Sequence, residues 1–304
     1  MPILILSGKL VSARLSLILG QFKNSGIINK NDFRIFDEII EKAGRFLKSK
    51  WTILVVVLVC YLQVFLVLFY ENEQTSMLSW QIKTIDGENF LNFAGKWSTL
   101  ISRPFILFLF LRWLLNIIVW GWVLRKISLL KLNLFAVHPD LCGGLGFIGY
   151  ALRFFSPIAF AISAAITGYM IDYILIEGVH LNSLKVPIIA YFIIITIIFI
   201  TPLLSFTQKL IDAREQSIFE NYDFANGIFR ELRKKFLKGY DGVTADDLNS
   251  PDFSAASDLS AVIENALNMK YIPFTLKDLL PLWVMTALPF LTVVIMEIPI
   301  NELL

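Results

Sequence analysis

The chain has 304 residues, of which 56% are hydrophobic and 17% are charged, with a formal net charge of +2. Soluble domains contain about 45–50% apolar and about 25% charged residues, so both fractions point away from a soluble protein. They also exclude intrinsic disorder, which requires low hydrophobicity and high charge, and two cysteines are too few for a disulfide scaffold. The composition predicts an all-α, polytopic membrane protein.

Residues 1–50 precede the first long apolar run. Their apolar stretches are short and are interrupted by Lys9 and Arg14, and no clear cleavage site follows, so we expect no signal peptide. From residue 32 to residue 50, apolar side chains recur every three to four positions, which predicts an amphipathic helix. This helix could lie along the membrane surface or pack on other cytoplasmic helices. Residues 1–50 are therefore predicted to be a cytoplasmic, N-terminal amphipathic helical segment.

Five later segments are apolar enough to cross the hydrocarbon core, which takes about 20 residues in a helix. The fourth is expected to continue into the cytoplasm without a break, and the fifth is shorter and contains Pro281 and Pro289. The predicted spans are residues 51–70, 104–124, 154–175, 186–206 and 279–296. The predicted domains are four transmembrane helices in residues 51–206, a cytoplasmic helical region in residues 207–278, and a fifth transmembrane helix with an extracytoplasmic C-terminus in residues 279–304.

The positions of lysine and arginine predict the orientation of these spans. Of the 27 basic residues, 22 lie in residues 1–50, 125–153 and 207–278, which this arrangement places on one side. Only four lie on the opposite side, and Arg112 lies within a span. Because cytoplasmic loops carry the excess of lysine and arginine, we expect the N-terminus in the cytoplasm and the C-terminus outside.

The cytoplasmic region begins with a heptad pattern that continues over about four repeats. Ile211, Ile218, Ala225 and Leu232 recur every seven residues, as in helices that bury one stripe against another helix. The partner could be the helix of residues 32–50 or a second copy of the chain. A basic cluster follows, which could be a solvated face or a patch for an anionic cytoplasmic ligand or partner protein. Its members are Arg230, Arg233, Lys234, Lys235 and Lys238.

A glycine-rich cytoplasmic loop, residues 138–149, connects the second and third predicted spans. Its glycines match the dinucleotide pattern G-x-G-x-x-G, but a membrane span follows and leaves no room for a βαβ unit. We expect either an ordinary tight loop or a gate or hinge at the cytoplasmic mouth, with Asp140 capping the next helix or pairing with Arg153. The residues of interest are His138, Asp140, Gly143, Gly144, Gly146 and Gly149.

This loop also carries a family resemblance. The string HPDLCGGLGFIG resembles the H-P-D-x-x-G-G-L-G-F-[LI] motif of an uncharacterised family of bacterial multi-pass inner-membrane proteins. Residues 250–259 and 273–289 are similar to that family too, so the resemblance covers roughly residues 130–300. It implies a location in the bacterial inner membrane and supplies no activity.

Polar residues inside the spans are candidates for function because placing them in lipid is costly. Arg112 and Asn116 are four residues apart and so share a helix face, and Asp172 is a possible partner for Arg112. These residues, with Ser163 and Thr167, could line a permeation path or lock helices together. Small residues in the third span, among them Ala161, Ala164, Ala165 and Gly168, would permit close packing of a neighbouring helix.

The sequence lacks the H-E-x-x-H, G-x-S-x-G and Walker motifs, and it has only two histidines. We therefore expect neither an enzyme, nor a metal site, nor a cofactor. The favoured hypothesis is a homo-oligomeric channel or pore in the lipid bilayer that is regulated by its cytoplasmic helices. A ligand-controlled effector, for example in phage defence, is one context in which such a channel would act. The alternatives are a non-conducting scaffold for partner proteins and a small secondary transporter.

Overall fold

The computed structural model describes residues 2–71, 82–85, 88–178, 181–237, 260 and 263–297, and the predicted extracytoplasmic tail at 298–304 lies outside these residues. The all-helical architecture is confirmed, with one small antiparallel hairpin of β1 (Ile82–Ile85) and β2 (Glu88–Leu91). The helices are α1 (Pro2–Asn24), α2 (Phe33–Lys48), α3 (Lys50–Glu71), α4 (Phe93–Trp97), α5 (Arg103–Ser128), α6 (Tyr150–Glu177), α7 (Leu181–Ile200), α8 (Thr207–Leu237), α11 (Leu276–Ala287) and α12 (Phe290–Glu297). A π-helical segment, Ser98–Ser102, joins α4 to α5.

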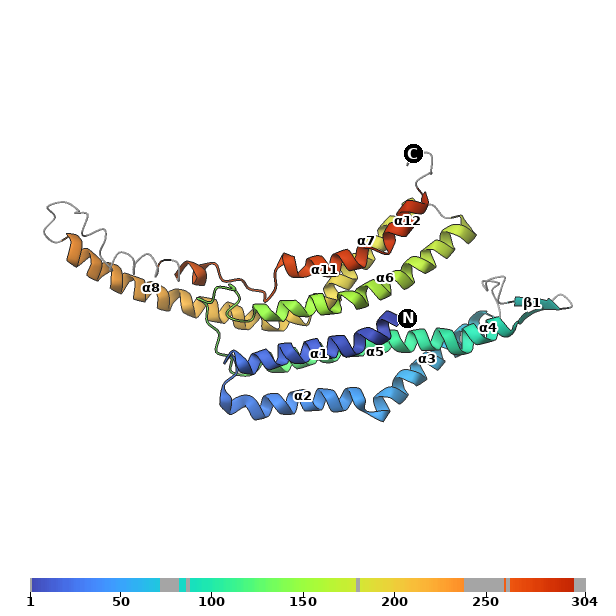
Figure 1. The fold of residues 1–304 in the computed structure, drawn as a ribbon, viewed down its shortest axis with the longest axis horizontal. Coiled ribbons are helices and arrows are strands. Elements are labelled where there is room, and N and C mark those ends of the chain that lie inside the picture. Colours follow the sequence, from blue (N-terminus) through green and yellow to red (C-terminus); the bar gives the residue numbers. More distant parts are fainter. Residues whose placement is uncertain are drawn as a thin grey trace.

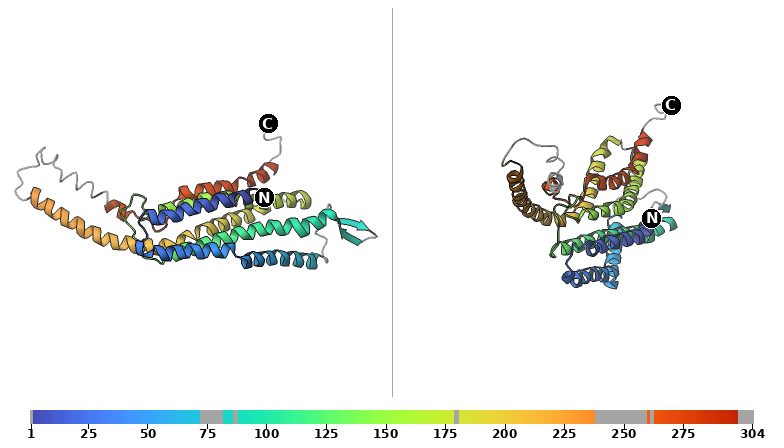
Figure 2. Two further views of the ribbon diagram at one scale, coloured as in Figure 1. Left: turned by 60° about the horizontal axis from the view of Figure 1, so that its bottom comes forward. Right: turned by 60° about the vertical axis from the view of Figure 1, so that its left-hand side comes forward.

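The long helices form an elongated bundle, and α8 projects from one end of it (Figures 1 and 2). Helix α6 packs against α1, α7 and α11, while α5 packs against α2 and α3. An aromatic cluster holds the end of the bundle from which α8 leaves. The Phe22 ring lies 5.1 Å from the Phe147 ring and 5.8 Å from the Phe206 ring. The end of α1, the turn before α6 and the turn before α8 therefore meet at this cluster.

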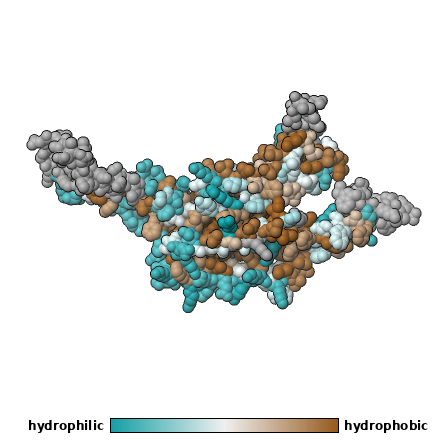
Figure 3. Space-filling view, viewed as in Figure 1, coloured by the Kyte–Doolittle hydropathy of each residue, from teal (hydrophilic) through white to brown (hydrophobic). Residues whose placement is uncertain are grey.

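The apolar helices fit a membrane protein. Four helical segments are long and apolar enough to span a bilayer, and two bent helix pairs raise that number to six if each pair is one span. The four segments are Pro2–Asn24, Phe93–Ser128, Gly146–Ile176 and Ser183–Ile200, and the pairs are Lys30–Lys48 with Lys50–Leu66 and Leu276–Ala287 with Phe290–Met296. Hydrophilic residues gather over the end that carries α8 and over α2, whereas hydrophobic residues dominate the opposite end (Figure 3).

Helix α1 is a long apolar helix that the sequence analysis did not predict. Its buried face includes Val11, Ile18 and Phe22, and the Trp113 indole N–H donates a 2.9 Å hydrogen bond to the Leu4 carbonyl. One of the two basic residues that interrupt the apolar pattern has an aromatic partner. The Arg14 guanidinium lies 5.8 Å from the centre of the Phe154 ring on α6. The first 50 residues therefore contain a candidate membrane span before the amphipathic helix.

The predicted amphipathic helix is present as α2, and it packs within its own chain. Phe36, Ile39 and Ala43 are buried, and the Phe36 ring lies 6.2 Å from the ring of Phe22 on α1. A salt bridge of 2.6 Å between Lys23 and Asp37 adds to this contact. Helix α2 thus packs on neighbouring helices of its own chain, and its position relative to a membrane stays a prediction.

The prediction that the fourth span continues unbroken into the cytoplasm is wrong. Helix α7 ends at Ile200, and a turn and a short 3-10 helix (Leu203–Phe206) separate it from α8. Pro202 lies at the break, where it lacks a backbone N–H and disfavours the helical conformation of the residue before it. The last predicted span is also interrupted, since α11 and α12 meet at 47° beside Pro289.

Candidate functional site

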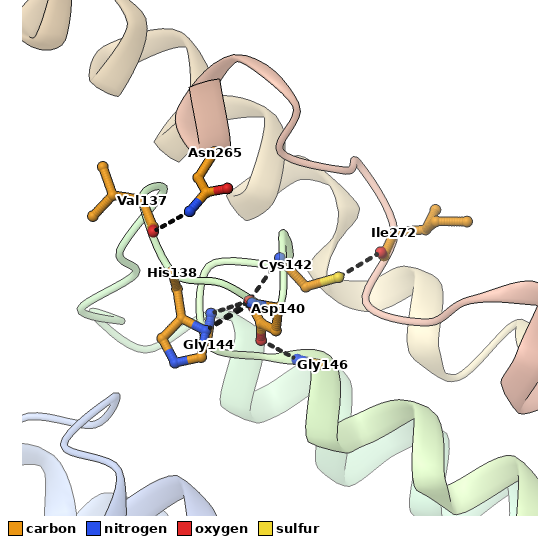
Figure 4. Close-up of polar contacts among 8 residues, drawn as sticks. All are labelled: Val137, His138, Asp140, Cys142, Gly144, Gly146, Asn265 and Ile272. Atoms are coloured by element: carbon orange, nitrogen blue, oxygen red, sulfur yellow. Dashed lines mark hydrogen bonds and ion pairs between the residues drawn. The ribbon is translucent and has the colours of Figure 1, made fainter. Parts of the chain in front are cut away.

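The loop between α5 and α6, residues 138–149, is called the glycine loop below. Asp140 organises it, because its carboxylate accepts backbone hydrogen bonds from Cys142 at 2.8 Å, Gly144 at 3.1 Å and Gly146 at 2.8 Å (Figure 4). The loop therefore winds around its own carboxylate. The Asp140 carboxylate thus caps the helical segment Gly146–Ile176, as predicted, by accepting from its first amide. The alternative, a pair with Arg153, is not formed, because Arg153 pairs with Asp278.

The His138 imidazole completes this arrangement. Its Nδ1 lies 2.9 Å from an Asp140 carboxylate oxygen and 3.2 Å from the Asp140 backbone nitrogen. A ring with a bare Nδ1 accepts the backbone N–H, whereas a protonated Nδ1 donates to the carboxylate. The ring can therefore keep a local partner in both protonation states.

Two glycines of the loop are required by their surroundings. Gly143 has φ +64°, and a Cβ there would lie 2.9 Å from the terminal methyl carbon of Met269. A Cβ on Gly149 would lie 2.9 Å from an Asp278 carboxylate oxygen. Leu141 also has a positive φ of 56°, which is uncommon for a residue with a side chain. The backbone of the loop thus lies close to Met269 and Asp278.

The glycine loop fastens segments that are distant in sequence. The Lys270 amide donates to the Leu141 carbonyl at 2.7 Å. The Cys142 thiol donates to the Ile272 carbonyl at 3.5 Å, and the Asn265 side chain donates to the Val137 carbonyl, next to the loop, at 3.5 Å (Figure 4). Just before the loop, residues 132 and 133 pair with residues 26–28 between α1 and α2. A gating role, which stays a prediction, would use the loop as a pivot held by these bonds.

The loop environment shifts two pKa values in opposite directions. Burial raises the pKa of the Asp140 carboxyl, but the three backbone hydrogen bonds outweigh it and leave the pKa below its usual value. Burial, reinforced by the negative charge of Asp140, raises the pKa of the Cys142 thiol to about 11. The carboxyl is therefore charged at neutral pH, and the thiol is protonated and poorly nucleophilic.

Arg153 pairs with a residue of α11. Its guanidinium lies 3.2 Å from Asp278 and stacks 4.8 Å from the centre of the Tyr150 ring. Asp278 also accepts hydrogen bonds from the backbone N–H of Thr275, at 2.9 Å, and from its hydroxyl, at 2.8 Å, as part of a capping box. This pair was not predicted from the sequence, although Thr275 and Asp278 have the Thr-x-x-Asp spacing before an apolar run that indicates a capping box.

The polar residues predicted inside the membrane do not form one cluster. Arg112 is half-buried, and one terminal nitrogen is buried without a hydrogen-bond partner among the described residues. Asp172 is exposed on α6 and makes no ion pair with any residue that the structure describes. The expected Arg112–Asp172 pair is therefore not formed within the chain. Asn116 shares the helix face of Arg112, as predicted from its spacing.

Ser163 and Thr167 point into the bundle. Both are buried, and the Ser163 hydroxyl lies 2.9 Å from the hydroxyl of Tyr191 on α7. The Thr167 hydroxyl oxygen is buried without a hydrogen-bond partner in the described part of the chain. Ser163 therefore joins α6 to α7, and neither residue is exposed at the surface of the chain, where a path between subunits would run.

The basic cluster is only partly described. Arg230, Arg233 and Lys234 are exposed on α8, and Lys234 forms a 2.6 Å ion pair with Glu231. The side chain of Lys235 and the whole of Lys238 lie outside the described residues. The cluster stays a predicted anion or partner patch.

A cavity of about 610 Å³, called the bundle cavity below, opens between α1, α3, α5, α6 and α7. Apolar side chains such as Ile106, Phe110 and Ala161 make most of its wall. Polar groups come from Gln63, Arg103, Trp113 and Tyr191. Periodicity could not reveal the cavity, because it depends on which helices lie side by side.

Among the described residues, no three histidine, cysteine, aspartate or glutamate side chains are grouped closely enough to hold a metal ion. Comparisons with protein families, with curated proteins and with solved structures give no match for this chain. Its function must therefore be inferred from its own residues.

Proposed function

We propose that the chain is a subunit of a homo-oligomeric membrane channel that is regulated by its cytoplasmic helices. The observation that carries this proposal is an exposed face of small residues on α6. Ala164, Gly168 and Asp172 are spaced four residues apart and so lie on one side of the helix, and all three are exposed. A Cβ added to Gly168 would meet no atom within 4 Å.

The chemistry of this face favours a second copy of the chain as its partner. Small residues at four-residue spacing let two membrane helices approach closely, so that packing can drive their association. A carboxylate such as Asp172 is costly in contact with lipid, and it is normally found facing protein or water. A ring of copies that meet through α6 would remove this face from lipid and place Asp172 near a shared axis.

Two further observations support this arrangement. The unpaired guanidinium nitrogen of Arg112 requires water, an anion or a neighbouring subunit, because an unpaired charged group is unfavourable in an apolar interior. Helix α8 exposes Phe219, Tyr222, Phe224 and Phe229 outside the bundle, which suits contact between subunits. Its basic cluster suits an anionic ligand or partner protein, as expected of a ligand-controlled effector such as those of phage defence.

The proposed location is the bacterial inner membrane. The bundle end that carries the glycine loop and α8 also carries Lys23, Arg125 and Lys126, so the positive-inside rule places it in the cytoplasm. Helix α12 runs toward the opposite end (Figure 1), which supports the proposal that its C-terminal end faces outward. Helix α1 begins beside Trp113, partway along α5, and runs to the proposed cytoplasmic end at Lys23. In this arrangement the N-terminal end of α1 lies away from the cytoplasmic end, which differs from the cytoplasmic N-terminus expected from the sequence.

The first test is the oligomeric state of the purified protein, measured by native mass spectrometry in detergent. We expect an oligomer for the wild type and mostly monomer for Ala164→Leu, since the larger side chain separates the α6 helices. Ala190→Leu is the matched control, because it makes the same change at an exposed alanine on α7. A monomeric wild type contradicts the proposal, as does equal behaviour of the two variants.

The second test is ion flux into liposomes. We expect wild-type flux that is altered by Arg112→Ala and by Asp172→Asn, with Ala190→Leu again unchanged. An oligomer that shows no flux under any ligand condition indicates a scaffold, and saturable solute exchange by a monomer indicates a transporter. Either result rejects the channel.

A further inference from the structure

We propose that the bundle cavity binds one acyl chain of an anionic phospholipid, with the lipid phosphate held by Arg103. This inference does not depend on the channel, because it concerns a different face of the bundle. The cavity volume of about 610 Å³ falls within the range of roughly 300–1,000 Å³ that is typical of small-ligand sites.

The wall of the cavity determines what can occupy it. Leu107, Ile117 and Ile195 contribute hydrocarbon, and the Trp113 indole N–H already donates to the Leu4 carbonyl. Water is poorly held in such a space because a buried water needs two to four polar partners. An apolar occupant is therefore favoured.

The cavity is reachable from the lipid side of the bundle. Ile106, Phe110 and Ile194 line it, yet each has 39–54% of its surface exposed, so the wall is open at these residues. In a bilayer, the molecules next to this opening are lipids, and an acyl chain can enter sideways without crossing water. Transfer of the chain from bilayer to cavity exchanges one apolar environment for another, so affinity must come from contacts and from the headgroup.

Arg103 supplies the headgroup contact. It is the first residue of α5, at the end of that helix farthest from the glycine loop, and it lines the cavity. No ion pair to Arg103 is formed within the part of the chain that the structure describes. A guanidinium presents a planar fork of donors that matches two phosphate oxygens, and a net negative headgroup adds an attraction that a zwitterionic one lacks.

Ala161 and Ala165 create the space. Both line the cavity from α6, and because their side chains end at Cβ, the gap between α6 and α5 stays open. A larger side chain at Ala161 would occupy the volume of the acyl chain. Ala190, which is exposed on α7 and does not line the cavity, provides a matched position for the same change.

The experiment counts lipids retained by the full-length protein in native mass spectra after exchange between phosphatidylglycerol and phosphatidylcholine with identical acyl chains. We expect the wild type to retain phosphatidylglycerol about tenfold more strongly, as for a charge-assisted contact. Arg103→Gln should remove this preference and leave weak retention of both lipids, whereas Lys96→Gln, at an exposed lysine outside the cavity, should preserve it. Ala161→Phe should lower retention of both lipids, and Ala190→Phe should not.

Equal retention of the two lipids by the wild type overturns the headgroup assignment, and equal retention by Ala161→Phe and Ala190→Phe overturns the cavity assignment. If Ala161→Phe fails to fold, a photoactivatable phosphatidylglycerol supplies the test. Its crosslinks must map to peptides that contain Phe110 or Ala161, and crosslinks confined to other surfaces reject the proposal. Rejection of the lipid site would not affect the proposed subunit contact through α6, because that contact is tested separately by the oligomeric state of Ala164→Leu.

Discussion

Replacing Asp140 with asparagine tests whether the glycine loop is held by its carboxylate. Asparagine has nearly the same shape but offers one accepting oxygen in place of two. The amide can keep the bonds from Cys142 and Gly144, which share one oxygen, and it must then direct its own N–H₂ at the Gly146 amide. The substitution therefore removes one hydrogen bond and the charge that strengthens the other two.

The magnitude follows from these contacts. Loss of the bond to Gly146 costs about 1.5–3 kcal/mol, because it joins a charged acceptor to a backbone donor. The two remaining bonds become neutral and are weakened by roughly half. Since the Asp140 side chain is 22% exposed, water recovers part of this cost, and we expect a loss of about 2–4 kcal/mol in the stability of the loop.

Hydrogen exchange measured by mass spectrometry reports the loss of stability in the peptides that contain the glycine loop. A loss of 2–4 kcal/mol corresponds to exchange that is about 30-fold to 1,000-fold faster in peptides covering residues 138–149. Asp212→Asn is the control, because Asp212 is an exposed carboxylate on α8 that accepts from the Gln208 side chain. Unchanged exchange of the glycine loop in Asp140→Asn, or the same change in both variants, would refute the reasoning.

The pH dependence of this contribution has a definite sign. The pKa of Asp140 is lower in the folded protein than in the unfolded chain, so its carboxylate stabilises the fold fully above the unfolded pKa of about 3.9. That contribution is lost as pH falls through the lower, folded pKa. The Tm difference between wild type and Asp140→Asn should therefore be constant from pH 7 to about pH 5 and shrink below about pH 4.

Three further predictions concern the contacts around the loop. Asp278→Asn should lower the unfolding free energy by about 1–3 kcal/mol, because this carboxylate is buried and caps α11. Arg153→Met should lower it by less than about 1 kcal/mol, because the guanidinium is 42% exposed. Equal losses for the two variants in chemical denaturation would contradict this. Gly143→Ala should lower the unfolding free energy by about 1–2 kcal/mol because of its positive φ alone. In a double-mutant cycle, adding Met269→Ala should recover only the further loss that comes from contact between the new Cβ and the Met269 methyl group. Cys142 should resist alkylation by iodoacetamide at pH 8 in the folded protein and react after denaturation, since burial holds its pKa near 11. Rapid labelling of the folded protein would show that the thiol is not buried and would contradict this prediction.

Hydrophobic run length predicted most of the bundle. The predicted spans at 51–70, 104–124 and 154–175 lie inside α3, α5 and α6, because apolar runs of that length form helices in which all backbone groups are paired. Helix α1 was missed because Lys9 and Arg14 divide its apolar residues into short stretches, so that no long apolar run marks it. The break after Ile200 was missed although Pro202 marks it in the sequence.

The partners of individual charges could not be predicted. Asp140 lies thirteen residues before Arg153 in the sequence, which suggested a local pair. In the structure, the Asp140 carboxylate instead accepts hydrogen bonds from the backbone amides of Cys142, Gly144 and Gly146. Arg153 instead pairs with a carboxylate 125 residues away. Such choices depend on which helix ends meet in three dimensions, and periodicity along one helix contains no information about that.

The bonds of the glycine loop have a consequence for biosynthesis. Cys142 and Ile272 are 130 residues apart in the chain, so the loop reaches the ribosome exit long before its last partners exist. At about 5–20 residues per second, that interval lasts roughly 7–26 s. During it, α6 and α7 are synthesised while the Leu141 carbonyl still lacks Lys270 and Arg153 still lacks Asp278 of α11. Chains truncated or stalled before residue 270 would expose these unpaired polar groups, by which quality-control proteases could distinguish them from finished protein.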